Sequence, residues 1–287
     1  MKKLCLKMIV TKIALATMVW MASVSVSAGS ITAKGSDTLV LLAQKWAETY
    51  MASHPETKIQ VIGGGSGIGF AALQNQTTDL ANASRKIKPK EMEECVKAFG
   101  RRPTEYKVCL DGLSVYVNGE NPLHELTVDQ LAGIFTGQIK NWKEVGGQDA
   151  LISLYGRENS SGTYEFFKEH ILKGKDFAAT TQTMQGTALV VQSVVKDKNG
   201  IGYGGAAYGA GATALAIKAT PGSPGIKPSE QTVMDGTYPI WRYLYIYVNP
   251  AIDKGEVAAY LSWIRGDEGQ KIVKENGYYP LPENMRK

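Results

Sequence analysis

The sequence predicts an α/β fold, with helices on the faces of a sheet. Short apolar runs alternate with segments whose apolar residues recur at helical spacing, which is the order expected of β-α-β-α units. Glycine accounts for 31 of the 287 residues and lies scattered among the apolar runs, so it marks many turns rather than low complexity. A chain of this length can bury a substantial core, as one large domain or two ordinary ones.

The first 28 residues have the pattern of a secretory signal peptide. Four lysines precede an apolar run from Ile13 to Val24, and Val26-Ser27-Ala28 is a small-x-small cleavage pattern. The run is short for a membrane span, and a retained N-terminal anchor is the alternative. Cys5 precedes the run, whereas a lipid-modified cysteine would follow it, so no lipid anchor is expected. We therefore expect cleavage after residue 28 and export of the rest.

Removal of this segment changes the charge balance. It takes away four lysines and no acidic residue, so the 32 basic and 27 acidic residues of the whole chain become 28 and 27, a net charge of +1. No basic tail or stripe remains that would indicate nucleic acid or an anionic membrane surface as a partner. An anionic ligand would therefore be bound by a few positioned polar or charged groups rather than attracted by a broad positive surface.

Two cysteines follow the signal segment, Cys95 and Cys109. In an oxidising, exported setting, an even pair predicts a disulfide that closes a short loop. The pair has neither a nearby histidine nor a CxxC spacing, so it would make a poor zinc site. We expect a disulfide between the two cysteines, and neither a metal nor a cofactor.

Caps and periodicity place the first elements. Residues 30–34 predict a strand, and Ser36 or Asp37 can cap a helix whose apolar residues recur between positions 39 and 50. Pro55 ends that helix. The alternation continues with a strand over 58–62, a helix over 70–74 and a strand over 80–83. Later strands are expected at 113–118, 151–155 and 243–249, and later helices at 126–135, 166–171, 188–195 and 256–275.

Three turns rich in glycine, serine and threonine stand at predicted helix starts. They are Gly35-Ser36-Asp37-Thr38, the loop from Gly63 to Gly69 around Ser66, and the turn from Arg157 to Thr163. A helix start presents unpaired backbone N–H groups and the positive end of the helix dipole. Glycine lets an anion approach that backbone closely, and hydroxyls add further donors. Together the three turns predict a site that captures a small oxyanion.

Motifs of enzymes fit the chain poorly. Gly67-Ile68-Gly69 with Ala72 formally matches the dinucleotide fingerprint, but the next strand ends at Ser84-Arg85 and not at the acidic residue that holds a ribose. No Gly-Lys-Ser/Thr follows for a P-loop, and GxSxG is absent around Ser66 and Ser161. The three histidines lie apart in the sequence, so no triad is indicated locally. A hydrolase whose serine finds distant partners stays an alternative.

Arg157 is the strongest single indication of an anion, although a capped helix beside a surface arginine is the alternative. Its planar guanidinium matches tetrahedral oxyanions and stays charged when partly buried. Asp111 and Asp37 are negative charges that could oppose an anion at this site. The alternative for Asp111 is a turn residue, and the alternative for Asp37 is a plain N-cap. A carboxylate repels an oxyanion unless a proton lies between them. Either aspartate could therefore select hydrogen phosphate and reject fully ionised sulfate.

With these residues assembled, the chain resembles the phosphate-binding proteins of bacterial phosphate ABC transporters. The resemblance covers essentially the whole mature chain, and its most specific parts are Phe135-Thr136-Gly137, Trp142 to Gly147, and Arg157 with Ser161-Gly162-Thr163. It implies a type II two-lobe periplasmic binding protein, α/β in class, in which each lobe is a mixed sheet flanked by helices. One inorganic phosphate would lie in the cleft between the lobes.

The resemblance also implies boundaries, partners and ligands. Residues 1–28 would be the signal peptide, 29–112 and 242–287 the first lobe, and 113–241 the second lobe. The protein would be a periplasmic monomer without catalytic turnover, and it would deliver phosphate to an inner-membrane ABC permease. The positions that match the family's ligand residues are Ser36, Thr38, Ser66, Ser84, Arg85, Arg157, Ser161, Gly162 and Thr163.

One departure from the family pattern concerns the acceptor of the phosphate proton. Some members carry aspartate where Arg85 and Asn159 stand in this chain. The accepting carboxylate must therefore come from elsewhere, with Asp111 as the first candidate and Asp37 as the second. The alternative functions are a receptor for sulfate, molybdate or tungstate, a binding module without a permease, and a secreted serine-dependent phosphatase or esterase.

Overall fold

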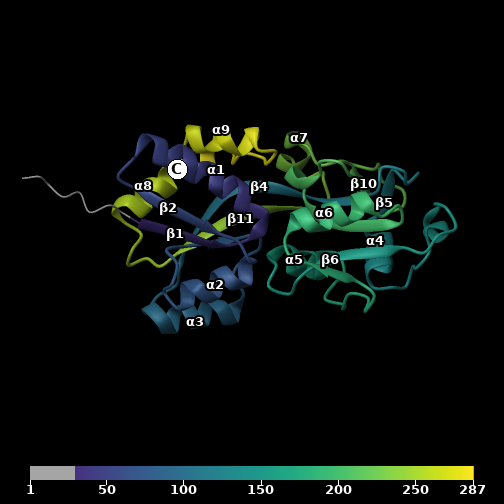
Figure 1. Cartoon of the computed structure of the whole chain (residues 1–287), viewed down its shortest axis with the longest axis horizontal. Coiled ribbons are helices and arrows are strands. Elements are labelled where there is room, and N and C mark those ends of the chain that lie inside the picture. The colour runs from purple at the N-terminus through teal and green to yellow at the C-terminus, as the bar shows by residue number, and fades with distance from the viewer. Residues whose placement is uncertain (1–29, 287) are drawn as a thin grey trace, which may run out of the picture.

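The computed structural model describes residues 30–286, and the predicted signal peptide lies outside these residues. The chain forms an elongated molecule whose two parts lie end to end (Figure 1). The first part begins with the strand–helix alternation that the sequence predicts, which is thereby confirmed. Its elements are β1 (Ser30–Gly35), α1 (Asp37–Ser53), β2 (Lys58–Ile62), α2 (Ser66–Gln74), β3 (Leu80–Ala83) and α3 (Pro89–Phe99).

A long strand, β4 (Thr104–Val117), joins the two parts. Up to Gly112 it pairs antiparallel with β11 (Trp241–Val248), and from Leu113 onward it pairs antiparallel with β8 (Gly200–Gly205). The main sheet therefore runs in the order β2-β1-β3-β11-β4-β8-β6-β7, with β9 also paired to β4. Because β1 pairs parallel with β2 and β3, and β11 pairs antiparallel with β3, the sheet is mixed.

The second part follows β4 in the chain and returns to the first through β11 (Figure 1). Its small two-stranded sheet consists of β5 and β10. Its elements are β5 (Glu125–Thr127), α4 (Val128–Phe135), η1 (Trp142–Val145), β6 (Ser153–Arg157), α5 (Gly162–His170), β7 (Gln182–Met184), α6 (Thr187–Lys196), η2 (Ala206–Tyr208), β9 (Thr213–Ala214), β10 (Ala216–Lys218) and α7 (Glu230–Met234).

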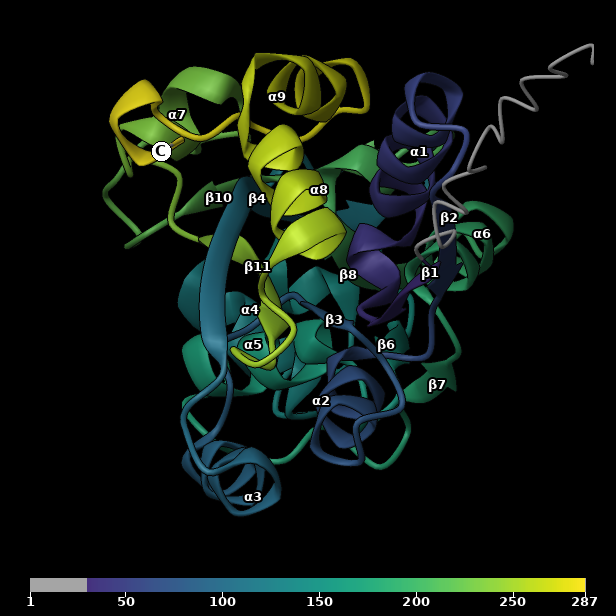
Figure 2. The same cartoon turned by 90° about the vertical axis from the view of Figure 1, so that its left-hand side faces the viewer.

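Separate apolar cores hold the two parts. In the first part, α1, α8 (Gly255–Arg265) and α9 (Asp267–Glu275) lie on one face of the sheet, and α2 and α3 lie on the other (Figure 2). Trp46, Tyr260 and Leu244 belong to the core beneath α1 and α8. In the second part, Phe135 and Phe167 lie in another buried cluster. Burial of such side chains stabilises the fold by about 1.5–3 kcal/mol each.

The C-terminal helix predicted for 256–275 is wrong in one respect, because the structure has two helices there. The break lies at Gly266, whose extended backbone ends α8 and begins α9. Asp267 and Glu268 occupy the first turn of α9, where acidic side chains favour a new helix start. The helical spacing continues across the break, so periodicity alone does not reveal it. The terminal 3₁₀ helix η3 (Glu283–Met285) follows α9.

The predicted disulfide between Cys95 and Cys109 is also wrong, because both cysteines are free and buried. Cys95 lies on α3 and packs in the cluster around Phe70, on the α2 and α3 side of the sheet. Cys109 lies in β4 and packs in the cluster beneath α1 and α8. The sheet therefore separates the two thiols. Burial raises the pKa of Cys95 to about 11, so this thiol is neutral at physiological pH.

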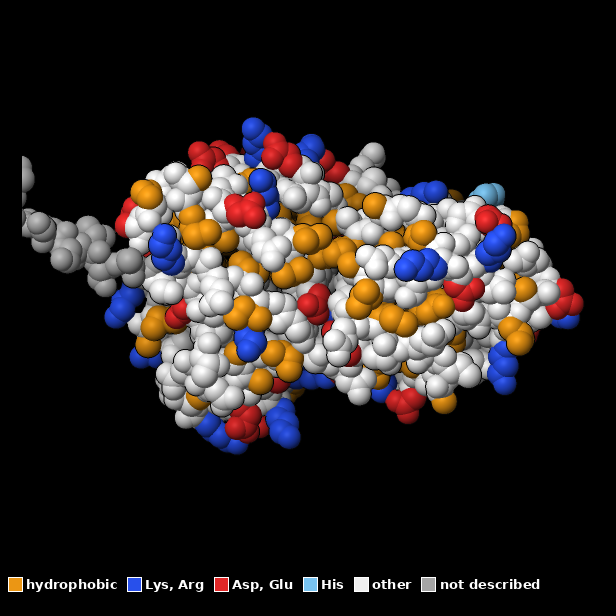
Figure 3. Space-filling model, in the orientation of Figure 1, with side chains coloured by type: hydrophobic (Ala, Val, Ile, Leu, Met, Phe, Trp, Pro, Cys, Tyr) orange, Lys and Arg blue, Asp and Glu red, His pale blue; other side chains and the backbone are white. Residues whose placement is uncertain are grey.

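On the face shown in Figure 3, basic and acidic side chains are interspersed, with apolar side chains across the junction of the two parts. Within residues 30–286, no helix is both long and apolar enough to cross a membrane.

Candidate anion-binding site

The first predicted turn starts α1. Gly35 has φ +141°, and a Cβ there would clash with the carbonyl oxygen of Asn82, so glycine allows β1 to pass close to β3. Ser36 is the N-cap residue of α1, and its buried Oγ has no hydrogen-bond partner among the described residues. Thr38 is buried beside it. This helix start therefore offers hydroxyl groups in a dry setting.

The second turn starts α2 beside the end of β3. Ser66 Oγ accepts a hydrogen bond of 3.0 Å from the Ser84 backbone N–H and lies 3.3 Å from Ser84 Oγ. Both serines are buried. The structure thus brings together a helix start and the carboxyl end of a strand, as the sequence predicts, with two hydroxyls side by side.

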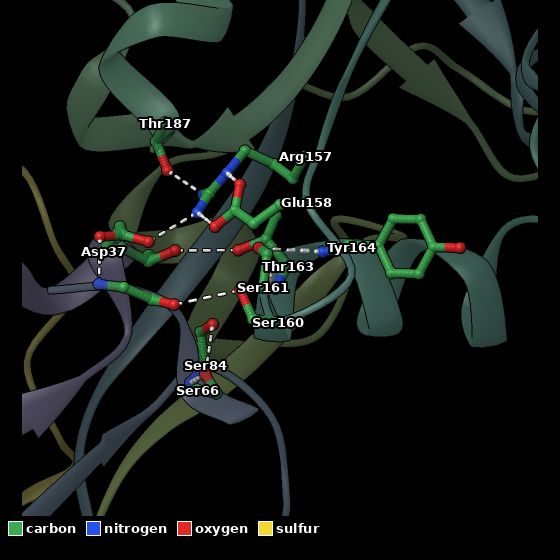
Figure 4. Close-up of polar contacts among 12 residues, drawn as sticks. Asp37, Ser66, Ser84, Arg157, Glu158, Ser160, Ser161, Thr163, Tyr164 and Thr187 are labelled. Carbon is green, nitrogen blue, oxygen red and sulfur yellow. Dashed lines mark hydrogen bonds and ion pairs between the residues drawn. The ribbon is translucent and has the colours of Figure 1, made fainter. Parts of the chain in front are cut away.

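The third turn starts α5 in the second part and meets the first two (Figure 4). Thr163 Oγ1 lies 2.8 Å from Thr38 Oγ1, and the Gly67 backbone N–H donates to the Ser160 carbonyl oxygen over 2.9 Å. Gly162 approaches so closely that a Cβ on it would clash with Ser66 Oγ and lie 2.6 Å from Ser84 Oγ. The starts of α1, α2 and α5 therefore converge on one place.

The Ser161 hydroxyl caps α5, because its Oγ accepts hydrogen bonds from the backbone N–H groups of Thr163 (3.2 Å) and Tyr164 (3.3 Å). The N-terminus of a helix with its positive dipole end is a ready anion-binding device. Here three such starts are combined with buried hydroxyls, which can donate to oxyanion oxygens. The residues that the structure gathers here are Ser36, Asp37, Thr38, Ser66, Ser84, Arg157, Ser161, Gly162 and Thr163.

Arg157 ends β6 and is almost fully buried, with a side chain only 1% exposed. Its Nη2 donates to Asp37 Oδ2 (2.8 Å) and to Glu158 Oε1 (2.7 Å). Its Nε donates to Glu158 Oε2 (3.0 Å), and its Nη1 donates to Thr187 Oγ1 (2.7 Å). Two carboxylates thus compensate the charge of this guanidinium, and one N–H of Nη1 is left over for a ligand.

Arg85, another predicted site residue, is directed elsewhere. Its Nη1 and Nη2 donate to the Glu91 carboxylate over 2.7 and 2.6 Å, and its guanidinium stacks 4.9 Å from the centre of the Phe70 ring. Glu91 lies in the first turn of α3, six residues further along the chain. The adjacent Ser84 points into the gathered site, whereas Arg85 holds the start of α3.

Asp111 is buried at the crossing strand, and it brings in a residue that the sequence analysis missed. Asp111 on β4 stands directly opposite Arg242 on β11 in the antiparallel register. Arg242 Nε and Nη2 both donate to Asp111 Oδ2, over 3.1 and 2.8 Å, and Nη2 also donates to Thr163 Oγ1 over 3.0 Å. Arg242 is the one charged residue in the apolar strand 241–248, and that is the signal that could have drawn attention to it.

The pKa values of two carboxyl groups beside the arginines, Asp111 and Glu158, shift in opposite directions. Complete burial raises the pKa of Asp111 above its ordinary value, although the charge and hydrogen bonds of Arg242 oppose this shift. Burial also acts on Glu158, but the hydrogen bonds and charge of Arg157 outweigh it and lower the pKa of Glu158. Asp111 therefore binds a proton more readily than an ordinary aspartic acid, and Glu158 less readily than an ordinary glutamic acid.

Known proteins resemble this chain in sequence and in fold. A model of the PBP superfamily domain matches residues 22–268. The phosphate-binding protein PstS of Pseudomonas aeruginosa is 36% identical over 273 residues, which cover 90% of this chain and 84% of that protein. The PstS protein of Bacillus subtilis is 33% identical over 266 residues, covering 90% of this chain and 82% of the relative.

Solved structures agree with these relatives. A substrate-binding protein with bound phosphate from Clostridium perfringens superposes with a TM-score of 0.81 and 25% identity, covering 88% of this chain and all of that one. An ABC-type phosphate transport receptor from Vibrio cholerae gives a TM-score of 0.71 and 27% identity with the same coverage. The α/β, two-lobe binding-protein fold that the sequence predicts is thereby confirmed. The chain belongs to the PstS-like phosphate-binding proteins of the PBP superfamily.

Proposed function

We propose that this chain captures inorganic phosphate between its two lobes and delivers it to an ABC permease. The observation that carries the proposal is the meeting of three helix starts, at Ser36, Ser66 and Ser161, around buried hydroxyls and beside two buried arginines. The names of the relatives and of the solved structures support the same ligand and the same transport role. We place the lobe boundaries at 112/113 and 241/242, where β4 changes its partner and β11 begins.

The ligand shell that we propose consists of hydroxyl and backbone donors from both lobes. We assign the phosphate proton to Asp111 or Asp37, because each carboxylate accepts from an arginine of the site, Asp37 from Arg157 and Asp111 from Arg242, which also donates to Thr163 Oγ1. Sulfate, fully ionised, would leave that carboxylate facing a second negative charge without a proton between them. The shell residues are Ser36, Thr38, Ser66, Ser84, Ser161, Gly162 and Thr163, with Arg157 beside them and Arg85 retained as an outer candidate.

Calorimetric titration of the purified protein with phosphate and with sulfate tests this function. We expect heat and a saturable isotherm with phosphate and a much weaker response with sulfate. Tight sulfate binding without a phosphate response would refute the assignment to phosphate. Asp111→Asn and Asp37→Asn, titrated with both anions, distinguish the two carboxylates, because only the proton acceptor should lose the preference for phosphate when it is replaced.

We further propose that the protein is a binding protein without turnover. His54 and His170 each have Nδ1 within hydrogen-bond distance of the backbone carbonyl oxygen four residues earlier, at Tyr50 and Phe166, so neither Nδ1 is directed to Ser66 or Ser161. Assays with phosphate esters and carboxylic esters test this point. Steady hydrolysis that is abolished by Ser66→Ala or Ser161→Ala would establish the serine-dependent hydrolase instead.

Export to the periplasm as a monomer is the remaining part of the proposal. The PstS relatives and the cleavage pattern at Val26-Ser27-Ala28 support it. N-terminal sequencing of the mature protein from a periplasmic fraction should begin at Gly29. Recovery of the intact chain with the membrane fraction would indicate a retained anchor.

A further inference from the structure

Arg242 carries a feature that the proposed shell does not use. The residue is 5% exposed, and its Nη1 has no hydrogen-bond partner among residues 30–286. Its other donors are engaged, because Nε and Nη2 hold Asp111 and Nη2 also holds Thr163. A buried charged donor without a partner is costly, and native proteins rarely leave one without a reason. The unpartnered nitrogen therefore points to a ligand.

The position of Arg242 identifies the chemistry of that ligand. Its Nη2 contacts Thr163 Oγ1, which lies 2.8 Å from Thr38 Oγ1, so the guanidinium directly adjoins the meeting point of α1 and α5. Arg242 also lies on the wall of a cavity of about 430 Å³, formed by residues that follow β3, by α5 and by β11. Phe166 of α5 packs against its guanidinium, 5.1 Å from the ring centre. Arg242 therefore lies between the gathered hydroxyls of α1 and α5 and this cavity.

The charges around the two arginines favour Arg242 as the cation of the site. Arg157 contacts two carboxylates, Asp37 and Glu158, so that group of three carries a net negative charge. Arg242 contacts one carboxylate, Asp111, so that pair is neutral and keeps one nitrogen for the ligand. A guanidinium held from one side by a carboxylate can donate from its other side in a fixed direction.

We propose that Arg242 binds the phosphate directly, with Nη1 donating to a phosphate oxygen while Asp111 and Thr163 fix the guanidinium in place. The proposal rests on phosphate as the ligand. It adds to the ligand shell a residue of β11, the strand in which the chain returns to the first lobe. It also gives Asp111 a second role, which is to hold the Arg242 guanidinium in position. Phosphate would then be held by donors from α1, α2, α5 and β11 at once.

Two variants test the proposal by phosphate calorimetry. The double variant Arg242→Gln with Asp111→Asn removes both charges of the pair and keeps amides of similar size, which avoids a lone buried charge. We expect its phosphate affinity to fall by about tenfold or more below that of Asp111→Asn alone, because the charged hydrogen bond from Arg242 is lost in addition. Arg242→Lys keeps the positive charge beside Asp111. Its single ammonium nitrogen cannot contact Asp111, Thr163 and phosphate in the fixed fork of a guanidinium, so this variant should also bind phosphate more weakly.

A matched control replaces another ion pair, far from the site. Lys218→Gln with Glu125→Gln removes the 3.1 Å pair between β10 and β5 and should bind phosphate like the parent protein. Circular dichroism establishes that each variant is folded before titration. If the parent protein binds phosphate and both Arg242 variants bind it equally well, this proposal is overturned and the proposed function stands. If the parent protein does not bind phosphate, the proposed function itself fails.

Discussion

The two buried arginines of the site form different kinds of contact. Arg157 reaches from β6 of the second part to Asp37 at the start of α1 in the first part, so its ion pair spans the junction. Arg242 and Asp111 stand opposite each other on the adjacent strands β11 and β4, so their pair lies within the sheet. Only the first pair depends on how closely the two parts approach.

The two ion pairs therefore differ in whether they depend on closure of the lobes. Lobe closure around a ligand brings groups of both lobes together, and an ion pair across the junction can form only when the lobes are near. The Arg157 pair can therefore report the closed arrangement, together with the contact between Gly67 and Ser160. The contact between Arg242 and Asp111 lies within the sheet and is set by strand register, although Arg242 Nη2 also reaches across to Thr163 Oγ1 of α5.

The largest expected effect comes from breaking the pair inside the sheet. Arg242→Gln leaves the Asp111 carboxylate buried without its partner, and it should lower the free energy of unfolding by about 3–5 kcal/mol. Arg157→Gln should cost less, because its carboxylate partners, Asp37 and Glu158, are 16% and 19% exposed and remain partly solvated. Denaturant unfolding of both variants measures the difference. Equal losses of stability in the two variants would mean that the partial exposure of Asp37 and Glu158 does not reduce the cost of removing their arginine.

The next effect concerns affinity. Arg157→Ala leaves Asp37 and Glu158 facing the site without their counter-charge, so phosphate binding should weaken by more than about 2 kcal/mol. Calorimetry with phosphate measures it, with Lys218→Gln and Glu125→Gln as the folded control. An unchanged affinity would show that the pair across the junction has no part in binding, and it would move the site away from Arg157.

The prediction for Gly162 tests closure itself. Gly162→Ala places a methyl group against Ser66 Oγ and Ser84 Oγ, so α5 can no longer approach the first part as closely. Overpacking of this kind costs about 1–3 kcal/mol, which we expect as a loss of phosphate affinity of about tenfold with little change in stability. Gly119→Ala is the matched control, because a methyl group there meets no atom within 4 Å. Unchanged affinity for Gly162→Ala would show that close approach is not required.

The sequence predicts the elements and the three helix starts because these depend on local signals. Caps, glycines and apolar spacing lie within a few residues of the feature that they predict, as at Ser36 and Ser161. Arg242 has no such signal, since its role depends on the strand register that places it opposite Asp111. Arg85 carries the expected motif, but a carboxylate on the next helix holds its guanidinium.

The cysteines show the same limit in another form. Their number and the exported setting predict a disulfide, but whether two thiols meet depends on which face of the sheet each side chain takes. Cys95 comes from a helix on one face and Cys109 from a strand residue that faces the other core. Local patterns therefore predict the donors of the site better than the pairings that cross the fold.

The smallest effect follows from the carboxyl groups beside the two arginines. The pKa of Glu158 is lowered in the folded state, so its contribution to stability is present above its ordinary pKa and is lost as the pH falls through the folded value. The pKa of Asp111 is raised by burial, so the folded state binds a proton more readily. The free energy of unfolding therefore falls as the pH rises from the ordinary pKa of Asp111 to its folded one, with a slope of up to about 1.4 kcal/mol per pH unit. Carbon-13 NMR of the carboxyl groups should find Asp111 titrating above its ordinary range and Glu158 below its own, with Asp111→Asn and Glu158→Gln assigning the two signals. Titration of Asp111 below its ordinary range would mean that Arg242 outweighs burial, as Arg157 does for its neighbour Glu158.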